Sequence, residues 1–338
     1  MVRLRRSSPD DPGWTRRRAG KGFVYLDGDG ERLPDEDAQR VKDLVIPPAW
    51  QDVWVCPWPN GHLQAVGTDD AGRRQYLYHP DWRVRRDSEK FARMLDFGRA
   101  LSKAREKVLV DLGAEGMSQE RACAVAVRLL DLGYFRIGND VYADQNGSFG
   151  LTTLERRHVR KEADTVIFAF TGKSGIDHRI EIDDPGAVQA LEVMRRRRGG
   201  DDGLLAWKDG RRWRSLDSSL VNDYVRATTG LDATAKDFRT WHATVIAAAA
   251  LAEAAEEMAA KKASKAARKR AEVAAMKEVS EFLGNTPALA RSSYVDPRVI
   301  DAFEEGHTIG TANNRRYRTA DARQAALERA VLRLLKEA

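Results

Sequence analysis

The amino-acid sequence predicts an α+β protein in which a small N-terminal β-sheet domain, residues 1–88, precedes a larger, mainly α-helical domain, residues 89–338. Two observations predict this division. The first 88 residues contain short runs with strand character separated by turn residues. From about Ser88 the apolar residues recur with a period near 3.6, which indicates helices. A chain of 338 residues is also long enough for two domains of about 150 residues each.

Four strands and one helix are expected in the first domain. The helix covers residues 35–45 and ends before Pro47 and Pro48. Turn signals, such as the one at residues 59–61, separate the runs that have strand character. The expected strands cover residues 23–27, 52–56, 62–67 and 73–78.

Two long helices are expected at the start of the second domain. The first extends to about Leu112 and is stopped by Gly113. Ser118 is expected to cap the second helix, which presents one apolar face and ends at Gly133.

A β-hairpin is expected next, with strands over residues 165–170 and 178–182 and a turn at residues 172–175. The Ala-, Lys- and Glu-rich stretch 247–276 is interpreted as a long solvated helix, in preference to an arm that binds nucleic acid. The rest is predicted to be helical except for loops near residues 200–215, 230–235 and 284–296.

Composition excludes several classes of protein. The net charge of +6 and the pI near 9.3 suit a polyanionic partner, but they also suit an ordinary surface. No apolar run approaches the ~18 residues of a membrane-spanning helix. No apolar stretch follows the charged N-terminus, so no secretory signal is expected. Cys56 and Cys123 are too far apart for a CxxC zinc site and too few for a disulfide framework, which favours a reducing cytoplasm.

Two partial motifs do not predict a cofactor. Gly172-Lys173-Ser174 resembles the end of a P-loop, but Ile167 occupies the position of the first P-loop glycine. Residues 27–31 resemble a calcium loop, but Arg32 stands where that loop requires glycine. The six histidines form no HExxH pair. We therefore expect no metal and no cofactor.

The candidate catalytic residues lie in the second domain, and each has an ordinary structural interpretation when taken alone. Arg136 follows a buried helix between apolar side chains, which favours a structural salt bridge. Lys173 is a common residue for a turn, and Lys236 and Arg239 would share a solvated helix face. Tyr294 would be a loop tyrosine.

Together these residues suit phosphoryl transfer, which needs a nucleophile, a clamp for the equatorial oxygens and an acid for the leaving oxygen. Arginine suits the clamp because its planar fork stays charged and pairs bidentately with phosphate. Lysine suits the acid because neighbouring cations lower its pKa. Tyrosine attacks as phenoxide where the same cations lower its pKa from about 10. The set is consistent with a metal-free phosphodiester transferase that works through a phosphotyrosine.

Six segments carry a family resemblance: residues 46–50, 59–65, 73–76, 134–154, 170–175 and 236–241. Matching in order along one chain, they resemble the type IB DNA topoisomerases, specifically the compact bacterial branch related to the poxvirus enzymes. The resemblance covers roughly residues 20–305. It implies a catalytic domain with the fold shared by type IB topoisomerases and tyrosine recombinases.

The resemblance implies a role for each candidate catalytic residue. Arg136 and Arg239 resemble the two arginines that hold the scissile phosphate, and Lys173 resembles the hairpin lysine that protonates the departing 5′ oxygen. Tyr294 matches the nucleophile that becomes joined to the DNA 3′ phosphate. Lys236 lies where relatives have a Lys or His on the same phosphate, which makes it a secondary phosphate contact.

Asn285 departs from the poxvirus pattern, because those enzymes have histidine nine residues before the nucleophile. The resemblance to the bacterial branch implies asparagine there. An amide donates a hydrogen bond to a non-bridging oxygen but does not titrate near neutral pH. The alternative is that Asn285 only begins a turn before Pro287.

The resemblance also implies DNA contacts in both domains. In the first domain they lie on the last expected strand, where side chains alternate and the two tyrosines share a face; a core role for one of these tyrosines is left open. The expected DNA-binding residues are Arg73, Arg74, Gln75, Tyr76, Tyr78 and Tyr142.

The resemblance therefore implies a monomeric enzyme that acts on double-stranded DNA in the cytoplasm, in association with the nucleoid. It would relax positive and negative supercoils without ATP or metal. The nearest alternative is a tyrosine recombinase or integrase, whose second motif is usually HxxR where this chain has Lys236 and Arg239. The other alternative is a DNA-binding protein without catalysis, which would be expected to lack one of Arg136, Lys173, Arg239 or Tyr294.

Overall fold

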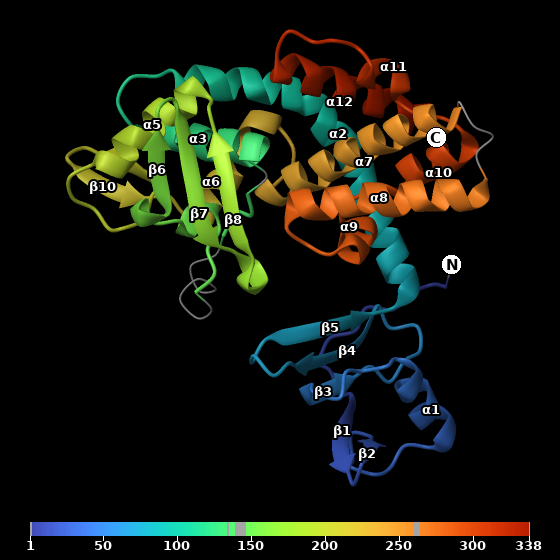
Figure 1. Cartoon of the computed structure of the whole chain (residues 1–338). Helices are drawn as coiled ribbons and strands as arrows, with labels where there is room; N and C mark the ends of the chain where they lie inside the picture. Colours follow the sequence, from blue (N-terminus) through green and yellow to red (C-terminus); the bar gives the residue numbers. More distant parts are fainter. Residues whose placement is uncertain (1, 134, 139–146, 260–263, 338) are drawn as a thin grey trace. The chain divides into compact units, whose positions relative to one another are not determined.

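The computed structural model describes residues 2–133, 135–138, 147–259 and 264–337. The chain forms two compact units, Met1–Lys90 and Phe91–Ala338 (Figure 1). Each unit has its own apolar core. The first unit is an antiparallel β-sheet and the second is mostly helical. The predicted fold class is therefore confirmed.

The first unit is built on a five-stranded sheet with the strand order β2-β1-β3-β4-β5. The helix α1 (Asp35–Asp43) buries Val41 in a core that includes Val53 and Val55 of the sheet. The predicted helix and four predicted strands are present, with small shifts at their ends. The strands are β1 (Trp14–Ala19), β2 (Gly22–Leu26), β3 (Gln51–Val55), β4 (Leu63–Thr68) and β5 (Arg74–Tyr78).

Strand β1 is the element of this sheet that the sequence does not predict. Three consecutive arginines remove the alternation of apolar and polar residues that indicates a strand. The Arg16 guanidinium donates to the carbonyls of Ile46 (3.2 Å) and Trp50 (2.5 Å), and its Cζ lies 4.1 Å from the ring centroid of Phe23. The long side chain of Arg16 thus packs where an apolar residue would be expected.

Two helices open the helical part of the chain. The first, α2 (Pro80–Leu112), begins before the predicted start near Ser88 and ends where predicted. The second, α3 (Gln119–Gly133), is capped as predicted, because the Ser118 hydroxyl accepts the Arg121 N–H at 3.2 Å. Most of α3 is buried, so it forms the centre of the second unit.

A three-stranded antiparallel sheet with the order β6-β7-β8 packs on α3 through β8 (Figure 1). Strands β7 (Thr165–Thr171) and β8 (Asp177–Ile182) form the predicted hairpin around a 3-10 turn, η3 (Lys173–Gly175). The strand β6 (Val159–Glu162) is an additional partner of β7 that the sequence does not predict. Two more 3-10 turns, η1 (Leu151–Thr153) and η2 (Arg156–His158), come before the sheet in the chain. Helix α5 (Pro185–Arg196) follows the sheet.

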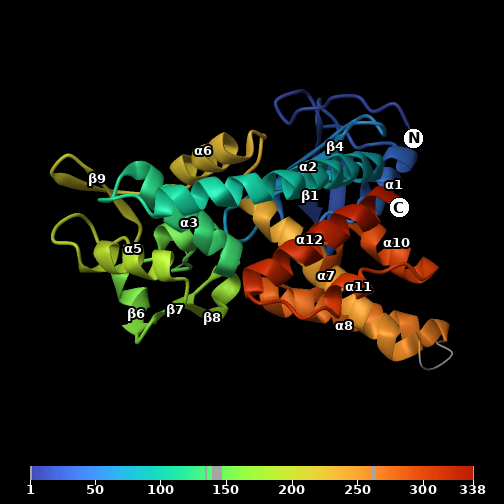
Figure 2. The same ribbon diagram turned by 90° about the horizontal axis from the view of Figure 1, so that it is seen from above.

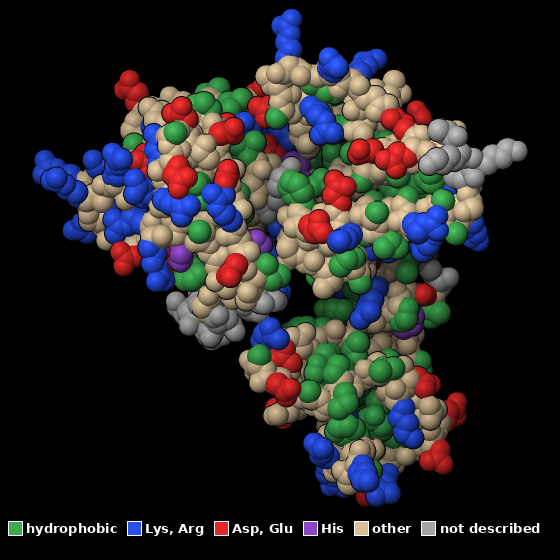
Figure 3. Space-filling model, in the orientation of Figure 1, with side chains coloured by type: hydrophobic (Ala, Val, Ile, Leu, Met, Phe, Trp, Pro, Cys, Tyr) green, Lys and Arg blue, Asp and Glu red, His purple; other side chains and the backbone are tan. Residues whose placement is uncertain are grey.

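The predicted loop at residues 200–215 is wrong, because this region contains the hairpin of β9 (Ala206–Asp209) and β10 (Arg212–Ser215). Its strands are only four residues long, and most of their side chains are polar or charged, so the strand pattern is too short to recognise. Basic side chains gather over the end of the second unit that carries the β9–β10 hairpin (Figure 3).

Helix α7 is the centre of the remaining helices: it lies beside α8 and contacts α6, α10, α11 and α12 (Figure 2), and α9 packs on α8. The remaining helices are α6 (Ser218–Thr229), α7 (Ala235–Ala259), α8 (Lys265–Leu283), α9 (Pro287–Ser293), α10 (Pro297–Glu305), α11 (Gly310–Asn313) and α12 (Ala320–Glu337). None of the helices in the described ranges is both long and apolar enough to cross a membrane.

Two expectations about these helices are wrong. The stretch 247–276 is not one solvated helix, because Ser264 caps a new helix at Ala267 N–H (3.2 Å), and Leu251 and Met276 are buried. The stretch 284–296 is not only a loop, because it contains α9. In that helix Thr286 caps Leu289 N–H at 3.3 Å, so a cap and the following proline suffice to start a short helix.

A buried charge network holds four of these helices together. Arg105 of α2 donates to Asp131 of α3 (2.7 Å) and to Glu328 of α12 (2.6 Å). His242 of α7 makes a 3.0 Å hydrogen bond with Asp131. Because each partner is satisfied within the core, the network fixes α7 relative to α3.

Candidate active site

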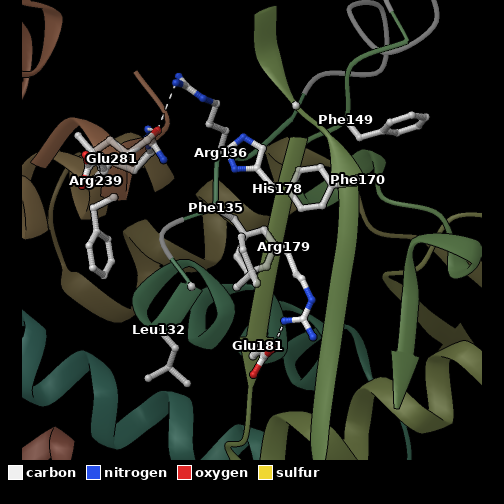
Figure 4. A pocket seen from close by; sticks show the side chains of 15 residues that line it. Leu132, Phe135, Arg136, Phe149, Phe170, His178, Arg179, Glu181, Arg239 and Glu281 are labelled. Atoms are coloured by element: carbon white, nitrogen blue, oxygen red, sulfur yellow. Dashed lines mark hydrogen bonds and ion pairs between the residues drawn. The ribbon is translucent and has the colours of Figure 1, made fainter. Parts of the chain in front are cut away.

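Two arginines from separate elements converge on the C-terminal end of α8. Arg136, which follows α3, donates from Nη2 to the carbonyls of Gly284 (2.9 Å) and Leu283 (3.4 Å). Arg239, in α7, donates from Nη2 to the same Leu283 carbonyl at 2.6 Å. The last carbonyls of a helix lack partners within the helix and carry partial negative charge, so they attract cations. The end of α8 thus orients both guanidinium groups (Figure 4).

The salt-bridge interpretation of Arg136 does not hold among the described residues, where its guanidinium donates to main-chain carbonyls and not to carboxylates. A guanidinium held by carbonyls keeps its full positive charge and has further N–H donors to offer. This arrangement is suited to an anionic ligand more than to a structural ion pair.

Tyr294 lies beside this pair of arginines at the end of α9. Its side chain is buried, its N–H donates to the Ala290 carbonyl (3.0 Å), and the Arg239 Cζ lies 5.7 Å from its ring centroid. Burial acts to raise the pKa of Tyr294, but the charges of Arg239, Arg136 and Lys236 outweigh it. The pKa of Tyr294 is therefore lower than that of a free tyrosine, which favours the phenoxide.

Arg239 is 5% exposed, so its charge acts in a medium that screens weakly. Burial, and next the charge of Arg136, lower the pKa of Arg239 to about 10. With this pKa Arg239 is still a cation at neutral pH. Two adjacent cations at a partly buried site create a strong attraction for a phosphate.

Asn285 follows the αL glycine that caps α8. Gly284 has φ +58°, a conformation that glycine adopts without strain, and it turns the chain so that Asn285 leaves the helix axis. Both amide atoms of the Asn285 side chain are buried, and neither has a hydrogen-bond partner among the described residues. A buried amide without a partner is costly, and such groups often mark the place of a ligand. The turn-only interpretation of Asn285 leaves these atoms unexplained.

The two lysines occupy different positions around the site. Lys236 is exposed in the first turn of α7, three residues before Arg239 on the same helix. The predicted solvated face is wrong, because Arg239 is buried. The positive charge of Lys236 is one of the charges that lower the pKa of Tyr294. Lys173 is exposed in the turn η3 at the tip of the hairpin. The neighbour of Lys173, Gly172, borders a cavity that Arg136 and Arg239 also line.

This cavity has a volume of about 370 Å³ and is lined by residues of both the β7–β8 hairpin and the C-terminal end of α8 (Figure 4). Phe170 and His178 line its hairpin side, and Phe282 and Leu283 line its α8 side. The described residues contain no cluster of three or more His, Cys, Asp or Glu side chains arranged to hold a metal ion. The lining residues thus give the cavity guanidinium donors and aromatic walls.

The sequence does not single out two side chains that contact this site. Thr244 of α7 accepts the Asp296 N–H (3.1 Å) and donates to the Tyr294 carbonyl (3.3 Å), so it holds the main chain on both sides of Val295. His178 of β8 packs in the cavity. The only sequence signal for Thr244 is its position on the helix that carries Arg239, and the signal for His178 is its strand position beside the Lys173 turn.

The expected DNA contacts of the first unit lie on or beside β5. Tyr76 and Tyr78 are 45% and 37% exposed, and their rings stack with centroids 6.2 Å apart, so neither belongs to the core. The exposed Arg74 lies on the same face of the strand.

Two further expected contacts share one carboxylate. Arg73 forms a 2.8 Å ion pair with Asp69, and the Gln75 amide donates to the same group at 2.9 Å. The hydrogen bond from Arg73 is the main cause that lowers the pKa of Asp69 to about 2. Tyr142 lies outside the described residues.

Two models of known protein families match this chain. A family model for the catalytic core of eukaryotic DNA topoisomerase I matches residues 79–318, and one for the N-terminal domain of bacterial DNA topoisomerase IB matches residues 22–69. The chain belongs to the type IB DNA topoisomerase family. The expected family is thus confirmed, and the chain is an enzyme of this class.

Individual relatives agree with this assignment. A DNA topoisomerase 1B of Acanthamoeba polyphaga mimivirus is 29% identical over 295 residues, which cover 86% of this chain and 87% of the viral protein. DNA topoisomerase 1B of Vaccinia virus (strain Copenhagen) is 26% identical over 120 residues, covering 35% of this topoisomerase and 37% of the relative. DNA topoisomerase 1 of Schizosaccharomyces pombe is 29% identical over 159 residues, covering 46% and 18% of the two chains.

Proposed function

We propose that this enzyme relaxes both positive and negative supercoils in double-stranded DNA by cutting one strand, allowing the duplex to rotate, and rejoining the strand. The observation that carries the proposal is the convergence of Arg136 and Arg239 beside Tyr294. Three groups of the types needed for a phosphate clamp and a nucleophile come from elements far apart in the sequence.

In the cleavage step the Tyr294 oxygen attacks the scissile phosphorus and forms a 3′-phosphotyrosyl ester. The cations that lower the pKa of Tyr294 promote loss of its proton to water, so that the phenoxide attacks. Arg136 and Arg239 hold the non-bridging oxygens, and Lys236 is a secondary contact to the same phosphate. The amide of Asn285 donates to a non-bridging oxygen, which gives its buried N–H a partner.

The bond from phosphorus to the 5′ oxygen breaks as the tyrosyl ester forms. Lys173 donates a proton to that oxygen, so a neutral 5′ hydroxyl leaves and the lysine becomes a neutral amine. In religation the same hydroxyl returns its proton to Lys173 and attacks the ester, which releases Tyr294. The ester conserves the energy of the phosphodiester bond, so the cycle requires neither ATP nor a divalent metal ion.

The first unit supplies DNA contacts from its exposed face. Tyr76, Tyr78 and Arg74 present two stacked rings and a cation to solvent, a combination suited to a DNA groove and its phosphates. In this proposal Arg73 and Gln75 also reach DNA. The enzyme acts as a monomer, in the cytoplasm and in association with the nucleoid.

Plasmid relaxation tests the proposal. Negatively and positively supercoiled plasmids are incubated with wild type and Tyr294→Phe in EDTA without ATP. We expect wild type to relax both signs and Tyr294→Phe to relax neither while it still binds DNA. Lack of relaxation by wild type, or strand exchange between defined sites, would move the function to the recombinase alternative.

Lys173→Ala tests the leaving-group step separately. We expect slow cleavage of ordinary DNA and recovery on a substrate with a 5′-bridging sulfur, because a thiolate leaves without a proton. Without that recovery, Lys173 is not the acid.

A further inference from the structure

His178 occupies the space between the two segments that carry Lys173 and Asn285. It is the second residue of β8, just after the turn that contains Lys173. Its ring stacks on Phe170, with centroids 5.2 Å apart and planes inclined by 25°. Phe170 in turn stacks on Phe135 at 6.0 Å, so an aromatic column runs from the hairpin to the residue before Arg136 (Figure 4).

The His178 ring lies so close to Gly172 and Gly284 that neither position has room for a side chain. A Cβ atom on Gly172 would lie 2.6 Å from Cδ2 of His178, and one on Gly284 would lie 2.7 Å from Cε1. Atoms do not approach at such distances, so a side chain at either position would displace the imidazole. Gly172 directly precedes Lys173, and Gly284 directly precedes Asn285. One ring therefore sets the spacing between the two segments.

The ring acts through its shape and not through charge. Burial, and then the positive charges of Arg136 and Arg239, lower the pKa of His178 below its usual value. This shift favours the neutral form of the imidazole over a further cation at the site.

We propose that His178 is a positioning residue, whose ring fixes the Lys173 hairpin against the Gly284–Asn285 turn and so places the lysine for protonation of the leaving oxygen. The proposal rests on the function assigned to Lys173 above. Lys173 lies on an exposed turn, and a hairpin tip needs a fixed contact to deliver a side chain to one atom of a substrate. Small errors in such placement slow a reaction strongly.

The test compares single-turnover cleavage of two DNA substrates, one with an ordinary 5′ oxygen at the scissile bond and one with a 5′-bridging sulfur. For His178→Ala we expect cleavage of the oxygen substrate to slow by about 10- to 100-fold. On the sulfur substrate the rate should stay close to that of wild type, because protonation is no longer needed. DNA binding should be unchanged.

Two more variants keep the test decisive if His178→Ala does not fold. His178→Phe retains an uncharged ring between the glycines and should restore most of the oxygen-substrate rate. Gly172→Ala introduces a Cβ 2.6 Å from the ring and should reproduce the selective defect.

His158→Ala is the matched control. His158 is also partly buried and packs on a phenylalanine, Phe149, at 4.3 Å, but it does not lie between Gly172 and Gly284. Its loss should change neither substrate's rate substantially.

Equal slowing of His178→Ala on both substrates, or a wild-type rate on the oxygen substrate, would overturn the positioning role. Lys173→Ala, measured in parallel, separates this failure from failure of the proposed function. If sulfur does not rescue Lys173→Ala, the acid is assigned wrongly. If sulfur rescues Lys173→Ala but not His178→Ala, only the role of His178 is refuted.

Discussion

Replacing Asn285 with alanine should make the protein more stable and the enzyme slower. Both amide atoms of Asn285 are buried without a hydrogen-bond partner in the described structure. A buried polar group without a partner costs about 1–3 kcal/mol. Asn285→Ala removes these groups and leaves no new polar atom behind. We therefore expect its free energy of unfolding to rise by about 1–3 kcal/mol. The rise should be nearer about 1 kcal/mol if the loss of the amide's van der Waals contacts offsets part of the gain.

The catalytic effect has the opposite sign. If the Asn285 amide donates to a non-bridging oxygen in the transition state, its loss should slow cleavage by about 10²- to 10³-fold, as for other donors of this kind. Because an amide does not titrate near neutrality, the pH–rate profile should neither gain nor lose a step between about pH 6 and 7. Denaturant unfolding and single-turnover cleavage measure the two effects on the same preparation.

Asn222→Ala is the control for stability. The Asn222 side chain accepts the Ala235 N–H at 3.0 Å, so this asparagine has a partner. Its removal should lower the free energy of unfolding by about 1 kcal/mol. If Asn285→Ala destabilises the protein as much as Asn222→Ala does, the Asn285 amide is satisfied in the free enzyme. An unchanged cleavage rate would show that the amide does not meet the phosphate.

Three further changes have defined outcomes. Lys236→Ala removes a cation that lowers the pKa of Tyr294, so that pKa should rise and the pH–rate profile for cleavage should shift to higher pH; an unshifted profile would contradict this. Tyr76→Ala and Tyr78→Ala should each weaken DNA binding by roughly 1 kcal/mol, about fivefold, and leave the cleavage rate at saturating enzyme unchanged, as titration by fluorescence anisotropy would test. Thr244→Val should slow cleavage by about tenfold because the turn at Tyr294 loses its anchor, whereas Thr244→Ser should retain activity; equal rates would argue against the anchor.

Much of the fold is predictable from local patterns. The apolar period locates α2 and α3, and the Ser118 cap and the β7–β8 hairpin follow from residue types that act over a few positions. Strand β1 is not predictable in this way, because Arg16 packs through its long side chain and forms hydrogen bonds with carbonyls from another segment. The break before α8 depends likewise on a Ser264 cap and on burial against α7.

The candidate site shows a similar division. Two of the family segments contain Arg136 and Arg239, and the family resemblance assigns Tyr294 as the nucleophile. Their catalytic roles stay predictions until the experiments above are done. The convergence of both arginines on the Leu283 carbonyl depends on tertiary packing and has no local signal. The contact of His178 with Gly284 likewise joins segments far apart in the sequence.

Capture of the covalent intermediate tests the central claim most directly. Wild-type enzyme is mixed with a nicked or truncated DNA substrate that cannot be religated, the complex is digested with protease and nuclease, and the modified peptide is sequenced by mass spectrometry. The account predicts one adduct, a nucleotide joined through its 3′ phosphate to the Tyr294 oxygen, and no adduct in Tyr294→Phe. An adduct on another residue, attachment through a 5′ phosphate, or DNA cleavage without an adduct would contradict it.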